Sequence, residues 1–270
     1  MKKRFVSTLL AGVLTIGLLS TAACSKKASD DNQDLLAQIK ERGTIIVAME
    51  GNWAPWNYHD EDDKLVGFDT EVATHIAEKL GVEPEFVEGD WDGLLGGIEA
   101  GRYDIMVNGV DLTEEREEAY TFSEPYCYNK TVIIVPEDND DIHSLDDLDG
   151  KTTANSLNST YMEIAEQHGA TVTGVDTLDQ TLELVMQGRV DATLNAEVSF
   201  NDYMKVHSYA PLKIAATAGD ATGVAIPMRK DPSTDSLKEA IDKAIEELRD
   251  EGVLSELSMK YFDLDLSSEE

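Results

Sequence analysis

From Leu35 onward, short β-branched runs alternate with segments of helical periodicity. Thr44–Met49 is typical of a buried strand, whereas residues 69–80 repeat apolar side chains at helical spacing and stop at Gly81. The same reading predicts strands at 83–88, 103–107, 130–135, 151–155 and 171–175, and helices at 91–100, 177–187 and 197–205. Such alternation predicts an α/β fold of parallel sheets with helices on both faces.

A last helix is predicted near the end of the chain. Ser236-Leu237-Lys238-Glu239 has the spacing of a capping box, which opens a helix. Apolar residues follow at helical spacing as far as Gly252, which closes it.

The N-terminal segment is typical of an export signal. Cationic residues at positions 2–4 precede the apolar run 5–19, which is too short to remain across a bilayer. Small residues then lead to Cys24, a pattern that resembles the lipobox of bacterial lipoproteins, although Thr21 stands where Leu is usual. We therefore expect a signal peptide at 1–23, a lipidated Cys24 and a flexible tether at 24–34. The alternative is an ordinary signal peptide followed by a chance cysteine.

Charge and cysteine content exclude other classes. The chain has 22 Lys and Arg against 54 Asp and Glu, a formal net charge of -32, so no basic surface for nucleic acid is expected. Cys127 is the only cysteine besides Cys24, so the exported domain contains no internal disulfide once Cys24 is lipidated. Its core must be stable without one.

Catalytic and cofactor signatures are nearly absent from the sequence. Gly150-Lys151-Thr152 resembles the end of a P-loop, but Leu145 occupies the position of its first glycine. The five histidines are scattered and lack metal-ligand spacing, and no GxSxG motif occurs. We therefore expect no metal, no cofactor and no enzyme activity, which favours a receptor.

Distinctive motifs lie at 52–58, 67–69, 91–94, 112–116, 122–126 and 260–262. In order and separation they resemble the motifs of the family 3 bacterial solute-binding proteins, the polar amino-acid receptors of ABC importers. The resemblance implies two α/β lobes of the periplasmic-binding-protein type, joined by two crossing strands, with one amino acid between them. Lobe I would comprise 35–129 and 223–270, and lobe II 130–222. It also implies a monomer, anchored outside the cell membrane, that serves a permease and its ATPase.

The resemblance also implies how the ligand is held. Arg116 falls at the arginine that binds the ligand carboxylate, a role suited to a bidentate guanidinium. Residues 159–161 (Ser159, Thr160 and Tyr161) open a helix that would cap the same carboxylate. Trp53 and Trp91 would hold the ligand side chain between them. Asn108 and Gly109 would lie at the rim, with the Gly109 backbone near the ammonium.

One position departs from the family pattern. The lobe II aspartate that commonly pairs with the ammonium is replaced by Ala196, whereas Asp111 stands where lobe I usually has Ser or Thr. We interpret this as a carboxylate moved from lobe II to lobe I. The alternative is that Glu197 pairs with the ammonium and Asp111 only braces Arg116.

The ligand and the biological role remain open at this point. With Arg116 and Asp111 neutralising the zwitterion, the aligned pocket has no further charge, which favours a neutral polar or sulfur-containing amino acid, cystine included. A cationic ligand fits if Asp111 faces the side chain. An enzyme of the cyclohexadienyl or arogenate dehydratase type and an amino-acid sensor are the alternative functions.

Overall fold

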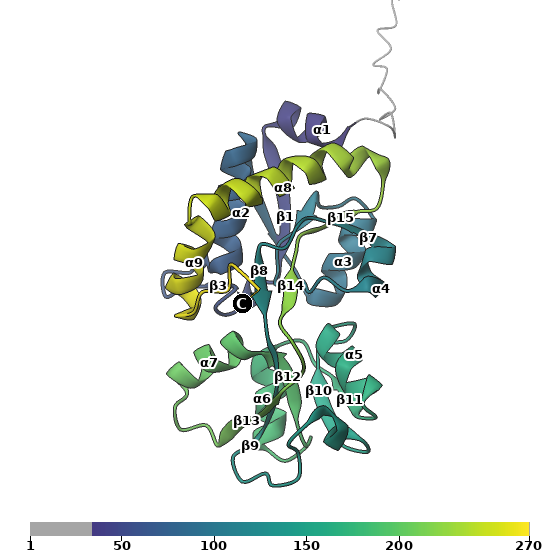
Figure 1. Cartoon of the computed structure of the whole chain (residues 1–270), viewed down its shortest axis with the longest axis vertical. Coiled ribbons are helices and arrows are strands. Elements are labelled where there is room, and N and C mark those ends of the chain that lie inside the picture. The colour runs from purple at the N-terminus through teal and green to yellow at the C-terminus, as the bar shows by residue number, and fades with distance from the viewer. Residues whose placement is uncertain (1–33, 270) are drawn as a thin grey trace, which may run out of the picture. The chain divides into compact units, whose positions relative to one another are not determined.

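The computed structural model describes residues 34–269 (Figure 1). The predicted signal peptide, Cys24 and all of the predicted tether except Asp34 lie outside these residues. Asp34 caps the first helix, because its side chain accepts a hydrogen bond from the backbone N–H of Ala37 at 2.8 Å.

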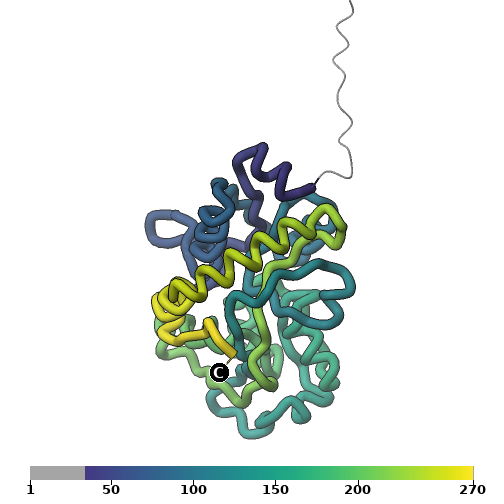
Figure 2. Tube along the Cα trace, turned by 45° about the horizontal axis from the view of Figure 1, so that its top comes forward, coloured from purple at the N-terminus to yellow at the C-terminus, as the bar shows by residue number. Residues whose placement is uncertain are grey.

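The first lobe is built on a three-stranded parallel sheet. Its strand order is β5-β1-β6, with β1 (Thr44–Met49) in the centre, β5 (Glu83–Glu88) on one side and β6 (Ile105–Met106) on the other. A small antiparallel sheet precedes the first long helix and consists of β2 (Asn52–Trp53), β3 (Asn57–His59) and β4 (Leu65–Val66). The helices of this lobe are α1 (Leu35–Arg42), α2 (Phe68–Leu80), α3 (Trp91–Glu99), α4 (Glu114–Ala119), α8 (Asp235–Asp250) and α9 (Val253–Phe262), with the 3₁₀ turn η2 (Pro232–Thr234) before α8. Figure 2 shows α8 running across the outside of the lobe.

The second lobe corrects the prediction of purely parallel sheets. Its main sheet has the order β12-β9-β13, in which β9 (Thr131–Pro136) runs antiparallel to both β12 (Thr193–Ala196) and β13 (Leu212–Thr217). β9 brings the chain into this lobe and β13 takes it back, so these two strands must run in opposite directions. β10 (Thr152–Asn155) and β11 (Thr171–Gly174) form the parallel pair that the alternation predicts. The helices are α5 (Thr160–Gln167), α6 (Leu178–Met186) and α7 (Glu197–Val206), with the 3₁₀ turn η1 (Leu145–Leu148) before β10.

Two strands connect the lobes. β8 (Cys127–Asn129) pairs antiparallel with β14 (Thr222–Val224), and Figure 1 shows this pair passing between the two bodies. Beside it in the first lobe, β7 (Tyr120–Phe122) pairs with β15 (Pro227–Arg229). The predicted two-lobe α/β fold is therefore confirmed, whereas the exact lobe boundaries remain a prediction.

The lobes pack directly against each other. Trp56 is completely buried in the aromatic core of the first lobe, where its ring lies 4.9 Å from that of Phe262. Its indole N–H donates to the hydroxyl of Ser199 on α7 at 3.0 Å, across the lobe interface. Ala196 and Val198 from the second lobe belong to the same apolar cluster. These contacts join the two lobes directly.

The predicted capping box of α8 is wrong. The N-cap is Thr234, which makes no side-chain capping bond, and α8 begins at Asp235. The hydroxyl of Ser236 instead donates to the carboxylate of Asp34, so it ties α8 to the start of α1.

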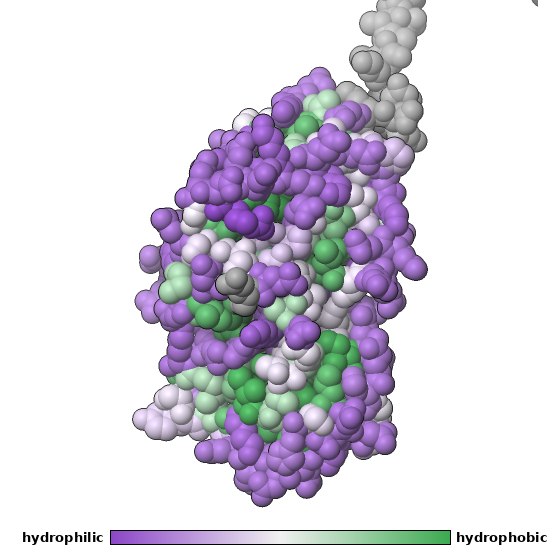
Figure 3. All heavy atoms as spheres, in the orientation of Figure 1, coloured by the Kyte–Doolittle hydropathy of each residue, from purple (hydrophilic) through white to green (hydrophobic). Residues whose placement is uncertain are grey.

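Polar residues cover most of the face seen in Figure 3, in keeping with the acidic composition.

Candidate functional site

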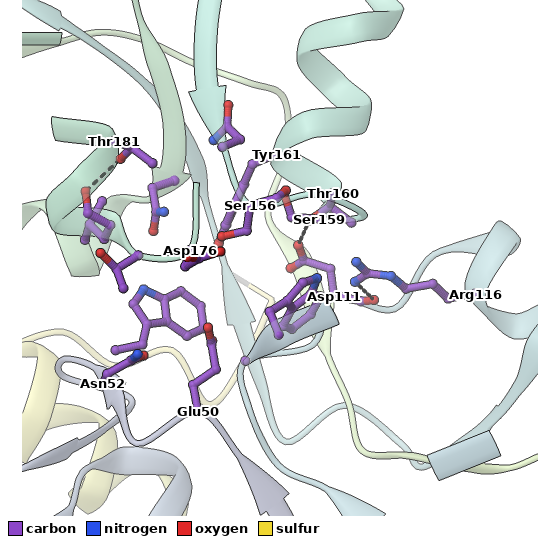
Figure 4. A pocket seen from close by; sticks show the side chains of 17 residues that line it. Glu50, Asn52, Asp111, Arg116, Ser156, Ser159, Thr160, Tyr161, Asp176 and Thr181 are labelled. Atoms are coloured by element: carbon purple, nitrogen blue, oxygen red, sulfur yellow. Dashed lines mark hydrogen bonds between the residues drawn. The ribbon is translucent and has the colours of Figure 1, made fainter. Parts of the chain in front are cut away.

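A pocket lies between the two lobes and encloses about 580 Å³, including the space at its mouth (Figure 4). The first lobe contributes Glu50, Asn52, Trp53, Trp91, Gly109, Asp111 and Arg116. The second lobe contributes Asn155, Ser156, Ser159, Thr160, Tyr161, Asp176, Thr177, Leu178, Thr181 and Asn195. A concave site between two lobes, lined by a few converging polar groups and aromatic side chains, is the usual form of a small-molecule site.

Arg116 is buried at one end of the pocket and is 7% exposed. It lies in α4, whose N-cap Thr113 accepts a hydrogen bond from the backbone N–H of Arg116. The guanidinium donates to the carbonyl oxygens of Asp111 at 3.2 Å and of Asn158, in the second lobe, at 3.3 Å. It also lies over the ring of Trp91, 5.3 Å from the centroid. These contacts hold a planar donor in place, as recognition of a carboxylate requires.

The N-terminus of α5 faces Arg116 from the second lobe. Ser159 is the N-cap, and its hydroxyl accepts from the backbone N–H of Met162 at 3.1 Å. The first N–H groups of a helix have no partner within the helix and favour an anion. Arg116 and this helix end together present hydrogen-bond donors that would suit a carboxylate.

Asp111 lies beside this end of the pocket with one oxygen unpartnered. It is 5% exposed, and its Oδ2 accepts from the hydroxyl of Thr160 at 2.5 Å. Oδ1 is buried and accepts no hydrogen bond from the residues that the structure describes. Burial raises the pKa of this carboxyl group, whereas the Thr160 hydrogen bond and the charge of Arg116 lower it. An ammonium group of a ligand would satisfy the free oxygen.

The alternative residue for the ammonium does not reach the pocket. Neither Glu197 nor Ala196 is among the lining residues, and Ala196 is fully buried in the apolar cluster between the lobes. The structure thus places Asp111, and not Glu197, at the pocket wall.

The two predicted tryptophans also line the pocket. Trp53 stacks on Trp56 with ring centroids 5.3 Å apart. Gly109 has φ of +56°, and a Cβ there would lie 2.5 Å from the Trp53 ring, so only glycine fits this position. The indole N–H of Trp91 is buried without a partner among residues 34–269, and a ligand acceptor would satisfy it.

Asn108 is the one predicted site residue that the structure keeps away from the pocket. It is fully buried, and its side-chain amide donates to Oε2 of Glu50 at 2.8 Å. Its Oδ1 accepts from the backbone N–H of Glu50 at 2.8 Å. Asn108 therefore positions Glu50, which does line the pocket.

The prediction of a pocket without further charge is wrong, because Glu50 and Asp176 also line it. Glu50 directly follows β1, and burial is the main cause that raises its pKa to about 7. The pocket thus has three carboxyl groups and one guanidinium. Glu50 directly follows β1, and Asn155 and Ser156 lie at and just after the end of β10. Ligand sites of α/β sheets gather beyond the carboxyl ends of the strands. That rule identifies Glu50, Asn155 and Ser156 in the sequence.

Two further findings concern other classes of site. In residues 34–269, no group of His, Cys, Asp and Glu could hold a metal ion. No helix in the same part of the chain is long and apolar enough to cross a membrane.

A family model matches residues 45–264, that of the bacterial extracellular solute-binding proteins, family 3. The chain belongs to this family. The L-cystine-binding protein TcyA of Bacillus subtilis is 37% identical over 268 residues, which cover 96% of this chain and 98% of that protein. The L-cystine-binding protein TcyJ of Escherichia coli is 32% identical, over 96% of both chains. Like these family 3 relatives, the chain is a substrate-binding protein and not an enzyme.

Solved structures of family 3 relatives share the two-lobe fold. An ancestral arginine-binding protein bound to arginine aligns with a TM-score of 0.75 at 35% identity, over 82% of this chain and 99% of that one. The L-cystine solute receptor of Neisseria gonorrhoeae, in its unliganded open conformation, is 39% identical but aligns with a TM-score of 0.59, over 87% of this chain and 98% of that one.

Proposed function

We propose that this chain is the substrate-binding lipoprotein of an ABC importer, which captures a free amino acid between its lobes and delivers it to the permease. The proposal depends on one observation. Arg116 and the N-terminus of α5, which are hydrogen-bond donors, lie at the same end of the pocket as the unpartnered Oδ1 of Asp111, which is an acceptor. An α-amino acid has a carboxylate and an ammonium on one carbon. Hydrogen-bond donors for the carboxylate and an acceptor for the ammonium are therefore needed at the same end of the pocket.

The other end of the pocket suits a second amino-acid head. Figure 4 shows Asn52 and Thr181 at the end away from Arg116, with Glu50 and Asp176 between the two ends. The N-terminus of α6 reaches the pocket through Thr177 and Leu178. We propose L-cystine as the ligand, because it has two carboxylates and two ammonium groups. Cystine-binding relatives at 37% and 32% identity support this choice.

L-Arginine is the second candidate ligand. Three carboxyl groups facing one guanidinium favour a ligand with excess positive charge, which arginine has and cystine does not. The likeness to an arginine-bound ancestral protein supports it.

Native mass spectrometry and calorimetry test the proposal. Protein purified without added ligand is weighed, and L-cystine, L-arginine and L-glutamate are then titrated into it. We expect binding of L-cystine, weaker or no binding of L-arginine, and none of L-glutamate. L-Cystathionine, which has a thioether instead of the disulfide, is the matched control for the two-headed shape. Failure of every amino acid to bind would exclude the proposal.

The membrane anchor is proposed from the sequence alone. Cys24 would be the N-terminal residue of the mature protein and would carry the lipid. We expect more than one acyl chain on it, because a single chain holds a protein at the membrane only marginally. Cys24→Ala should release the protein from the membrane fraction, whereas Cys127→Ala, a change at a buried cysteine, should leave it there. Membrane retention of Cys24→Ala would remove the lipoprotein assignment.

A further inference from the structure

One ion pair joins the two lobes outside the ligand pocket. Nζ of Lys205, near the end of α7 in the second lobe, lies 2.7 Å from Oδ2 of Asp263, which follows α9 in the first lobe. Figures 1 and 2 show α7 and α9 on the same side of the molecule. Every other salt bridge within residues 34–269 connects two residues of the same lobe. Neither Lys205 nor Asp263 lines the pocket.

Asp263 is held firmly on the first lobe. Its φ of +56° is the left-handed conformation that Asp and Asn adopt more readily than other residues with a side chain, and its backbone N–H donates to the carbonyl of Met259 at 3.2 Å. The tail that follows is fixed by the buried hydroxyl of Ser258. This hydroxyl donates to the carbonyl of Leu264 at 2.6 Å and accepts from the backbone N–H of Leu266 at 2.8 Å.

The same tail is also hydrogen-bonded to a hinge strand. The carbonyl of Leu266 accepts from the backbone N–H of Tyr128 in β8 at 2.8 Å, and Nε of Arg249 on α8 donates to the carbonyl of Ser267 at 3.4 Å. Figure 1 shows the yellow tail ending beside β8. Asp263 therefore begins a segment that is attached to the first lobe and to the hinge, while its carboxylate reaches the second lobe.

The charges around this ion pair are arranged so that Lys205 separates two acids. Burial raises the pKa of Asp202, also on α7, the charge of Lys205 lowers it, and the charge of Asp263 across the lobe interface raises it. Without the lysine, the joined lobes would bring the two aspartates together. In a chain with 54 acidic and 22 basic residues, contacts between lobes are repulsive unless a cation lies between them.

We propose that Lys205 and Asp263 form an electrostatic latch, which stabilises the joined lobes and slows the escape of the ligand. A ligand enclosed between the lobes leaves when they separate, and separation breaks this ion pair. Because the latch lies outside the pocket, it changes how long a ligand is held and not which ligand is chosen. Its effect on affinity rests on the proposed function, whereas its effect on the lobes does not.

Variants of the full chain separate the latch from a purely structural role of Asp263. Lys205→Glu replaces attraction by repulsion and should weaken L-cystine binding about fivefold to tenfold, mainly through faster dissociation. Asp263→Asn suits the same left-handed backbone and should weaken binding about twofold to fivefold. In the Lys205→Glu background, however, Asp263→Asn should strengthen binding, because it removes a like-charge contact. If Asp263 only ended α9, Asp263→Asn would weaken binding in both backgrounds.

Lys243→Glu is the matched control, because Lys243 is exposed and pairs with Glu247 within α8. It makes the same change of charge as Lys205→Glu and should bind L-cystine as the wild type does. Calorimetry measures the affinities, and stopped-flow tryptophan fluorescence measures the dissociation rates. Wild-type affinity of Lys205→Glu would overturn the proposal, as would an Asp263→Asn change that has the same effect in both backgrounds.

Small-angle scattering without ligand keeps the test independent of the proposed ligand. Lys205→Glu should have a larger radius of gyration than the wild type, and adding Asp263→Asn to it should reduce that radius. If L-cystine binds to none of the proteins, the proposed ligand is wrong, and the order of the radii still tests the latch. Equal radii of all these proteins would then overturn it.

Discussion

The two lobes contribute different chemistry to the same pocket. The first lobe supplies Arg116, Asp111, Glu50 and both tryptophans. Glu50 and Trp53 have partners within that lobe, whereas Asp111 and Arg116 also form hydrogen bonds with the second lobe. The second lobe supplies hydroxyl and amide groups and two helix N-termini, with Asp176 as its one charged contribution. Charge is thus concentrated on one side of the cleft, and neutral hydrogen-bonding groups on the other.

This difference suggests an order of events. A ligand can satisfy its charges on the first lobe alone, where fixed charges attract it and orient it. The second lobe adds donors at the ends of α5 and α6 only when the lobes close. Closure would then be stabilised by contacts that the ligand makes with the second lobe in the closed state alone.

Removal of Arg116 should have the largest effect on binding. Arg116→Ala leaves the ligand carboxylate buried without its main partner, so we expect a loss of about 3 to 5 kcal/mol in binding free energy. Calorimetry measures the loss, and Arg102→Ala, an exposed arginine of the same lobe, is the control. Full affinity of Arg116→Ala would show that the charges of the first lobe do not hold the ligand.

Asp111→Asn should come next, with a loss of about 2 to 4 kcal/mol. The substitution keeps the shape and removes the charge that would pair with the α-ammonium. Glu197→Gln is the control and should change binding by less than about 1 kcal/mol, since Glu197 does not line the pocket. If Glu197→Gln were the damaging change instead, Asp111 would be a brace for Arg116.

The family's usual lobe II aspartate should not rescue Asp111→Asn. Ala196 is completely buried in the apolar cluster between the lobes. An aspartate there would be buried among apolar side chains, which destabilises the closed state. Recovery of affinity in the double variant Asp111→Asn, Ala196→Asp would contradict the burial that the structure shows.

The sequence predicts the central strands of the fold well and the short ones poorly. β1 and β5 have the predicted bounds, because both are continuous strand patterns bounded by clear turn or helix signals. The hinge strands β8 and β14 have three residues each and pair across almost a hundred positions. Local patterns in the sequence carry no information about such distant pairing, and for the same reason they do not predict the antiparallel direction of β9.

For the site, residues of unusual type were easier to predict than ordinary polar ones. Arg116, Asp111 and the two tryptophans stand out in their motifs, and all four line the pocket. Glu50 and Asp176 do not stand out, because they are two of 54 acidic residues in a chain with an acidic surface. Only the fold shows which of these acids is turned into a buried cleft.

The smallest expected effect concerns a contact between the lobes outside the pocket. Trp56 donates to the hydroxyl of Ser199 at 3.0 Å, and both side chains are buried. Ser199→Ala leaves the indole N–H unpaired in the closed state, whereas water can satisfy it if the lobes open there. We therefore expect the closed state to be destabilised by about 1 kcal/mol, which weakens ligand affinity roughly fivefold.

Ser208→Ala, at an exposed serine after α7, should bind the ligand as the wild type does. Small-angle scattering with saturating ligand should show the same compact form for all three proteins, since the ligand restores closure. Unchanged affinity of Ser199→Ala would mean that this hydrogen bond persists in the open state and belongs to the hinge side of the molecule. The stability of the closed state would then depend only on the contacts that the two lobes make in the pocket.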